Sequence, residues 1–276
     1  MFGDYFLVLK FICICSFIAN FLSILNYIFR KHEMDIINIL NIQLVIAIFF
    51  QSFPLLFTPN EYGGFLKIFQ ALYSAIFTLS ISIITTFIAV SCCISIFYEA
   101  FFSKNKKIFI LSFSIISWIL PIIYELYLIK IKYIICQRNF CFYEIKNVAF
   151  PFIIYFTLLI INISCNVIMI VAIKKLMKNN KELRNIFIKK LIAFMSSSII
   201  LYGTYLIGMI PEIFHFHSKK SIYNFWNFCR NLFQSLTGLF VSVCYIYNKS
   251  FVIEIKNMFL CKKDNTFEFE KTEESN

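Results

Sequence analysis

Two carboxylates lie inside long apolar stretches of the sequence, where a charge is costly. Glu125 follows Pro121 by four residues, and Glu212 directly follows Pro211. A charged side chain at membrane depth usually faces the protein interior or a wet cavity, where it can contact a ligand. Alternatively, each carboxylate reaches the water around the lipid headgroups, because both lie near the end of their stretch. The candidate ligand-binding residues combine these glutamates with polar and aromatic residues of neighbouring stretches: Gln70, Tyr73, Glu125, Tyr155 and Glu212.

The remaining polar residues do not form a recognisable catalytic site. His215 and His217 lie close to Glu212 and form the only metal-like group in the sequence, but at the end of an apolar stretch they are typical of an interfacial polar cap. A Gly-rich phosphate loop and a Gly-x-Ser-x-Gly motif are both missing from the sequence. A retinal Schiff base would need a lysine within Phe228–Tyr247, and that segment has none. We therefore expect no enzymatic activity, no cofactor and no metal.

The 10 cysteines are mostly in apolar stretches, where they are expected to act as small apolar side chains. Cys136 and Cys141 differ, because both lie in a loop that is expected to be extracellular. A disulfide is permitted on that oxidising side if the two Cα atoms come within about 7 Å.

The elements that position these residues are seven apolar stretches separated by short polar segments. About 20 apolar residues at a rise of 1.5 Å each cross a hydrocarbon core of about 30 Å, and 60% of the 276 residues are hydrophobic. The sequence predicts an all-α membrane protein, a seven-transmembrane-helix bundle with a short interfacial helix after the last span. The third stretch exceeds the bilayer and is expected to tilt or project. The predicted spans are Tyr5–Phe29, Ile36–Phe57, Phe65–Phe101, Ile108–Ile129, Val148–Ile173, Leu191–Phe216 and Phe228–Tyr247.

Basic residues are concentrated in alternate loops of this predicted bundle, and the net charge is +11. The positive-inside rule then predicts an extracellular N-terminus and a cytoplasmic C-terminus, in the plasma membrane. The charge attracts anionic membrane lipids and requires no nucleic acid. We expect an extracellular segment 1–4, a single bundle domain 5–247, an interfacial amphipathic helix 248–263 and a disordered cytoplasmic tail 264–276.

The longest basic loop lies between the fifth and sixth spans. Its apolar residues recur near helical spacing, so both helices are expected to extend beyond the membrane. One interpretation is a surface that docks an acidic partner, and the other is plain positive-inside topology. The basic residues concerned are Lys174, Lys175, Lys178, Lys181, Arg184, Lys189 and Lys190.

The segment after the last span carries one apolar face. Phe251, Ile255 and Phe259 recur at helical spacing, which predicts a short helix lying in the membrane interface. Cys261 follows it, as a candidate palmitoylation site or an ordinary reduced thiol.

The last span, residues 232–248, reads LFQSLTGLFVSVCYIYN. Its Gln234, Gly238 and Tyr245 resemble the pattern in the last helix of cyclic-AMP-receptor-like and secretin-like G-protein-coupled receptors. Glycine there allows close helix approach, and the glutamine can hydrogen-bond across the bundle. Further residues that resemble the family are Gln70 in the third helix, Trp118 and Pro121 in the fourth, Cys141 in the following loop, and Pro151 at the start of the fifth.

The resemblance implies a receptor in which a small extracellular ligand shifts the sixth helix and the inner face engages a heterotrimeric G protein. Gly203, Gly208 and Pro211 are candidate flexing points of that helix, or simple packing positions. The family's helix-three cysteine is missing from this chain, so its usual bridge to Cys141 cannot form. Cys136 or Cys229 is the alternative partner, or no bridge forms.

A small-solute transporter or channel of the plasma membrane is the alternative function. It would require an aqueous path lined by polar groups near the bilayer midplane. The third span offers such groups: Ser80, Ser82, Thr85 and Thr86.

Overall fold

The computed structural model describes residues 2–29, 36–53, 63–128, 133–137, 140–144, 149–178 and 181–213, together with Leu232 and Leu236. The elements, in chain order, are α1 (Phe2–Phe29), α2 (Ile36–Ser52), α3 (Gly63–Phe97), α4 (Glu99–Lys104), α5 (Lys106–Leu128), β1 (Tyr133–Gln137), β2 (Phe140–Glu144), α6 (Ala149–Leu176) and α7 (Lys181–Ile213). Apart from those two leucines, the predicted seventh span, the interfacial helix, Cys261 and the tail lie outside the described residues.

Four of these helices are long and apolar enough to cross a membrane: α3, α5, α6 and α7. Shorter apolar stretches occur in α1 and α2, over Lys10–Leu25 and Asn38–Ser52. The predicted helical, membrane-embedded fold is therefore confirmed, and the count of seven spans stays a prediction. At 1.5 Å per residue, α3 and α7 are each about 50 Å long. Since a hydrocarbon core measures about 30 Å, both helices must tilt or project beyond it.

The distribution of side chains agrees with a membrane environment. On α5, Ile116, Ile119 and Ile123 are exposed, whereas Ser117 and Glu125 are buried. Apolar side chains thus cover the outside of this helix and polar ones lie within the bundle. That arrangement suits a lipid environment and would be unfavourable in water.

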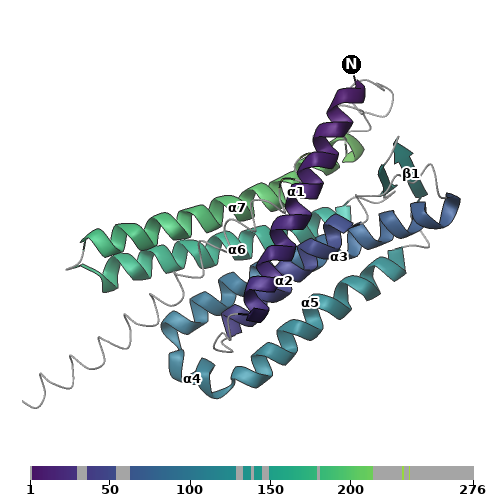
Figure 1. The fold of residues 1–276 in the computed structure, drawn as a ribbon. Coiled ribbons are helices and arrows are strands. Elements are labelled where there is room, and N and C mark those ends of the chain that lie inside the picture. The colour runs from purple at the N-terminus through teal and green to yellow at the C-terminus, as the bar shows by residue number, and fades with distance from the viewer. Residues whose placement is uncertain are drawn as a thin grey trace, which may run out of the picture.

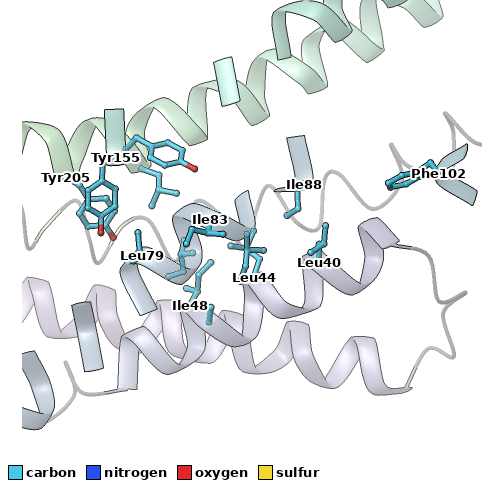
Figure 2. Packing of buried hydrophobic residues seen from close by; sticks show 14 residues of the cluster. Leu40, Leu44, Ile48, Leu79, Ile83, Ile88, Phe102, Tyr155 and Tyr205 are labelled. Atoms are coloured by element: carbon cyan, nitrogen blue, oxygen red, sulfur yellow. The ribbon is translucent and has the colours of Figure 1, made fainter. Parts of the chain in front are cut away.

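The central element is α3, which packs against α2, α5 and α6, while α6 packs along α7 and α1 along α2. Figure 2 shows Leu40, Leu44 and Ile48 on one face of α2 opposite Leu79 and Ile83 of α3. The leucines and the isoleucine of α2 recur at i, i+4 and i+8, which is the spacing of one helix face. This apolar contact holds α2 against α3 and fixes the depth of the polar side chains beside it.

Two elements differ from the predicted helices. The third predicted span was continuous to Phe101, but α3 ends at Phe97 and the short helix α4 follows after Tyr98. Phe102 of α4 is buried against Phe109 of α5, with ring centroids 5.2 Å apart, so the chain turns early to bury that ring. The predicted all-α fold also contains a two-stranded antiparallel sheet, β1–β2, in the loop between α5 and α6. We call its side of the molecule the hairpin end.

The hairpin and the basic loop lie at opposite ends of the bundle. In Figure 1, β1 and the marked N-terminus are at one end, and the turn between α6 and α7 is at the other, on the same side as α4. The hairpin backbone packs against α3. We call the opposite end, with the α6–α7 turn, the basic end.

Candidate functional site

The first polar contact between helices is centred on Gln51, near the end of α2. Its amide nitrogen lies 2.7 Å from the Thr78 hydroxyl of α3 and 3.2 Å from the Tyr205 hydroxyl of α7. A primary amide has two N–H donors, so one side chain bonds to two other helices at once. Gln51 is 2% exposed, so loss of its amide would remove two hydrogen bonds from the buried interior.

The second contact joins α3 and α7 one turn further toward the basic end. The Tyr202 hydroxyl donates to the Ser82 carbonyl and lies 2.6 Å from the Thr86 hydroxyl. All three residues are buried, and Tyr202 is fully so. Tyr202 and Tyr205 are three residues apart and therefore lie on neighbouring positions of one helix face. This face of α7 is held to α3 by hydrogen bonds from long side chains.

Further amides connect the other helices. The Asn162 amide of α6 donates to the Thr85 carbonyl of α3 at 3.3 Å, and the Asn166 amide donates back to Asn162. On the opposite side of α3, the Gln43 amide of α2 donates to the Ser114 hydroxyl of α5 at 2.7 Å. Helices α2, α3, α5, α6 and α7 are thus all connected through buried or half-buried polar side chains, which is how membrane helices gain specificity where hydrophobicity cannot provide it.

The structure resolves one alternative left open for Glu125. Its side chain is only 4% exposed, so it does not reach outward to headgroup water but faces the bundle. Ser117 and Pro121 precede it at i−8 and i−4 and are buried too, so the three form one interior stripe of α5. For Glu212 the structure gives the backbone within α7 only, and its two interpretations stay open.

The other candidate ligand-binding residues whose side chains are described lie on α3 and α6: Gln70, Tyr73 and Tyr155. The rings of Phe77 on α3 and Trp118 on α5 pack edge to face at 5.9 Å. Toward the hairpin end, Gln70 lies seven residues from Phe77 and Glu125 lies seven residues from Trp118. These two buried residues therefore lie at similar depth on adjacent antiparallel helices. Tyr73 instead packs its ring on Phe77 at 4.5 Å.

Tyr155 connects α6 to the hydrogen bonds on α7. The ring of Tyr155 stacks on that of Tyr205 at 5.2 Å. Figure 2 shows these two rings side by side at one end of the apolar cluster. Since Tyr205 also bonds to Gln51, a continuous set of contacts runs from α6 through α7 to α2.

The predicted helical extension of the basic loop is confirmed in the described residues. Helix α6 continues to Leu176 and α7 begins at Lys181. Below them, Met177 and Phe187 are buried in a separate apolar cluster that includes Met169 and Leu191. The basic end is therefore held by its own small core. Around it the described basic side chains are exposed, except for the half-buried Arg184: Lys174, Lys175, Lys178, Lys181 and Lys189. Lys190 is described through its backbone alone.

The hairpin brings the two loop cysteines opposite each other. Cys136 pairs with Cys141 in the strand register, next to the Gln137–Phe140 pair that closes the hairpin. Directly opposed residues of an antiparallel pair have Cα atoms about 4.5–5.5 Å apart, within the range that a disulfide requires. The register therefore permits the predicted bridge, which stays a prediction.

The residues that carried the family resemblance fall into two groups. Trp118 lies within the bundle and packs on the α3 core, and Pro121 and Pro151 are buried on α5 and α6. Gln234, Gly238 and Tyr245 lie outside the described residues. The described part thus contains the residues of the pattern on α5 and α6, the predicted fourth and fifth spans, but not those of the predicted last span.

Sequence reasoning missed the hydrogen-bonding residues Gln51, Tyr202 and Tyr205. The available signal was weak: polar groups inside apolar stretches, two of them three residues apart on one helix. Comparison with protein-family models gave no match, and comparison with curated protein sequences gave none either.

Proposed function

We propose that this chain is a seven-transmembrane G-protein-coupled receptor of the plasma membrane that transmits an extracellular stimulus to a heterotrimeric G protein. The observation that carries the proposal is the course of α7. One uninterrupted helix of 33 residues has Tyr202 and Tyr205 in the buried hydrogen-bonded interior and Lys181 and Lys189 at the exposed basic end. A displacement at the tyrosines is therefore transmitted along a rigid rod to the basic surface.

The contacts of α7 suit a helix that moves. It packs along α6, and Tyr202 and Tyr205 attach it to α3 by hydrogen bonds. Hydrogen bonds of this kind between membrane helices contribute about 0.6 kcal/mol on average. A ligand that favours the broken arrangement by a few kcal/mol would then shift the population of the two arrangements substantially.

The basic end suits an acidic partner. Its exposed lysines are displayed on a helical hairpin with its own buried core around Phe187, so their positions are fixed relative to one another. A topological signal alone requires positive charge but no such rigid display. In this proposal the basic end is cytoplasmic, the hairpin end is extracellular, and the N-terminus lies outside.

Guanine-nucleotide exchange on purified heterotrimeric G proteins tests the proposal. The chain is reconstituted in nanodiscs, and a variant with all seven basic residues from Lys174 to Lys190 replaced by glutamine is compared with wild type. A matched control replaces Lys104, Lys106 and Lys107, which lie at the same end but outside the α6–α7 hairpin. We expect exchange to be lost in the first variant and largely kept in the second. Equal exchange in wild type and both variants would refute the proposal.

The alternative, a small-solute transporter or channel, is less well supported by the polar residues of α3. Ser80, Ser82, Thr85 and Thr86 are buried as that function requires. However, each hydroxyl donates to the carbonyl one turn earlier in its own helix, at 2.7–3.1 Å. Hydroxyls engaged in this way have no need of water. Solute flux in proteoliposomes without any effect on nucleotide exchange would favour the alternative.

A further inference from the structure

We infer that Cys93 of α3 and Cys165 of α6 form a site of oxidative modification, where peroxyl radicals of the lipid bilayer convert the two thiols into an interhelical disulfide. The site is independent of the proposed receptor function. From the sequence alone, both cysteines are expected to act only as small apolar side chains.

The two thiols meet directly between the helices. Both cysteines are free and half-buried, and their side chains are hydrogen-bonded to each other. A cysteine side chain has a single carbon between the backbone and the sulfur, so two thiols make this bond only where the backbones lie close together. A disulfide requires the same closeness, with Cα atoms within about 7 Å.

The packing of α3 on α6 brings these positions together independently of the thiols. One turn before Cys165, the Asn162 amide donates to the Thr85 carbonyl at 3.3 Å, so a backbone atom of α3 lies within reach of a short α6 side chain. Cys93 also packs against the apolar cluster that contains Met169, which follows Cys165 by four residues and shares its helix face. Contacts between the two helices therefore lie on both sides of the cysteine pair along α6.

The pair lies at membrane depth, and this determines which oxidant can act on it. Cys165 precedes Lys174, the first basic residue of α6, by nine residues, which is about 14 Å along the helix. Peroxides dissolved in water react with the thiolate, and a thiolate is disfavoured in a medium of low dielectric. Peroxyl radicals form within oxidising lipid and take a hydrogen atom from a neutral thiol, so they need no thiolate. Since both cysteines are only half-buried, such radicals can reach them.

The reaction balances with two radicals. The first takes the hydrogen atom of one thiol and becomes a hydroperoxide, which leaves a sulfur radical against the second thiol. A second peroxyl radical takes the hydrogen atom of that thiol as the S–S bond forms. Two peroxyl radicals are thus reduced to two hydroperoxides, and two thiols are oxidised to one disulfide, each losing one electron and one proton. A lone thiol has no partner for this bond, whereas a pair in direct contact does.

The disulfide would join α3 to the helical hairpin of the basic end. Helix α6 shares the apolar cluster around Phe187 with α7, so a covalent bond from α3 to α6 also restrains α7. In the proposed receptor, oxidation should therefore reduce stimulated nucleotide exchange. This consequence alone rests on the proposed function.

Cross-linking of the full chain in nanodiscs tests the site. The lipid-soluble initiator azobis(dimethylvaleronitrile) releases peroxyl radicals within the bilayer in air, and the protein is then blocked at its free thiols, digested and analysed by mass spectrometry without reduction. We expect the peptide with Cys93 to be joined to the peptide with Cys165, and a phosphine reductant to separate them. The water-soluble azobis(amidinopropane), at an equal rate of radical release, should give this product more slowly. Absence of the joined peptides, or equal or faster formation with the water-soluble initiator, would overturn the inference.

Variants identify the two sulfurs. Cys93→Ser and Cys165→Ser should each abolish the joined peptides. Cys92→Ser is the matched control and should leave the product unchanged, because Cys92 is the neighbouring half-buried thiol and packs against the same cluster. Alanine replaces serine in either variant that does not fold. Joined peptides that persist without Cys93, or that disappear in folded Cys92→Ser, would show that another thiol reacts and would overturn the inference.

The result can be distinguished from that of the proposed function. Cross-linking that depends on both cysteines, in a protein without nucleotide exchange, would support the site and refute the receptor proposal. Exchange by a protein that forms no cross-link would do the opposite.

Discussion

Removing the hydroxyl of Tyr202 should weaken the attachment of α7 to α3 and activate the protein without ligand. This hydroxyl contacts the Ser82 carbonyl and the Thr86 hydroxyl, and the Tyr202→Phe variant deletes both contacts while keeping the ring. The ring is fully buried, so the packing of the apolar core is preserved and the change is confined to hydrogen bonding.

The magnitude follows from what the partners can do after the hydroxyl is lost. The Thr86 hydroxyl also donates to the Ser82 carbonyl at 3.0 Å, so neither partner is left without a hydrogen bond. The full penalty for a buried unsatisfied group is thus avoided, and the net loss should be about 1 kcal/mol. If this energy acts only in the arrangement with α7 attached, the detached population rises about fivefold, because RT is about 0.6 kcal/mol.

Two measurements check this value. Basal nucleotide exchange should rise about fivefold in Tyr202→Phe, while Tyr127→Phe, at an exposed position of α5, should leave it unchanged. A double-mutant cycle with Thr86→Val isolates the contact itself, and a coupling energy of about 0.5–1 kcal/mol in the stability of the protein is expected. A coupling energy of zero, or basal exchange equal to wild type with normal folding, would refute the reasoning.

Three further predictions concern stability and covalent structure. Gly203→Ala should raise the unfolding free energy by about 1 kcal/mol, because a Cβ there meets no heavy atom within 4 Å. If the helix flexes at this position, the variant should also slow stimulated exchange. Lower thermal stability of the variant would contradict the prediction. Denatured but unreduced protein should leave Cys136 and Cys141 unalkylated in mass spectrometry, and labelling of both would argue against the bridge. Gln51→Leu should lower stability by about 1–2 kcal/mol through loss of two hydrogen bonds, whereas Gln43→Leu should cost less, because it removes one bond together with a buried amide oxygen that has no partner.

Much of the helical fold could be predicted because hydropathy reports burial in lipid directly. The first six predicted apolar stretches correspond to α1, α2, α3, α5, α6 and α7. The end of the third stretch could not be predicted, since Phe97 and Phe101 are equally apolar. The helix ends before Tyr98 because Phe102 is then buried against α5, and this is a tertiary contact. The hairpin was missed for a similar reason, since strand pairing outside the membrane leaves little trace in a hydropathy pattern.

The direction of Glu125 illustrates what helical geometry could still have provided. Hydropathy alone does not say which side of α5 faces the bundle, because apolar and aromatic residues flank the carboxylate in the sequence. Ser117 and Pro121, at i−8 and i−4, lie on its face, whereas Ile119 and Ile123 lie on the lipid side. The small and polar residues marked the interior stripe. The partners of Tyr202 and Tyr205, in contrast, lie more than 100 residues away in sequence, and no local pattern encodes them.

The geometry of α7 gives the two hydrogen-bonded tyrosines unequal mechanical roles. Tyr205 lies three residues from Tyr202 on the hairpin side, about 4.5 Å along the axis, whereas Arg184 lies eighteen residues away on the basic side, about 27 Å. If Tyr202 acts as the pivot, a displacement at Tyr205 is amplified about sixfold at Arg184. Hydrogen bonds such as Gln51–Tyr205, at 3.2 Å, are lost once the atoms separate by a few tenths of an ångström more. A shift of about 1 Å, small enough for a ligand beside Tyr155 to impose, would thus move the basic surface by about 6 Å. Spin labels at exposed Lys189 and Lys107 would detect that movement as a change in distance, and an invariant distance in a protein that activates nucleotide exchange would mean that α7 does not act as a lever.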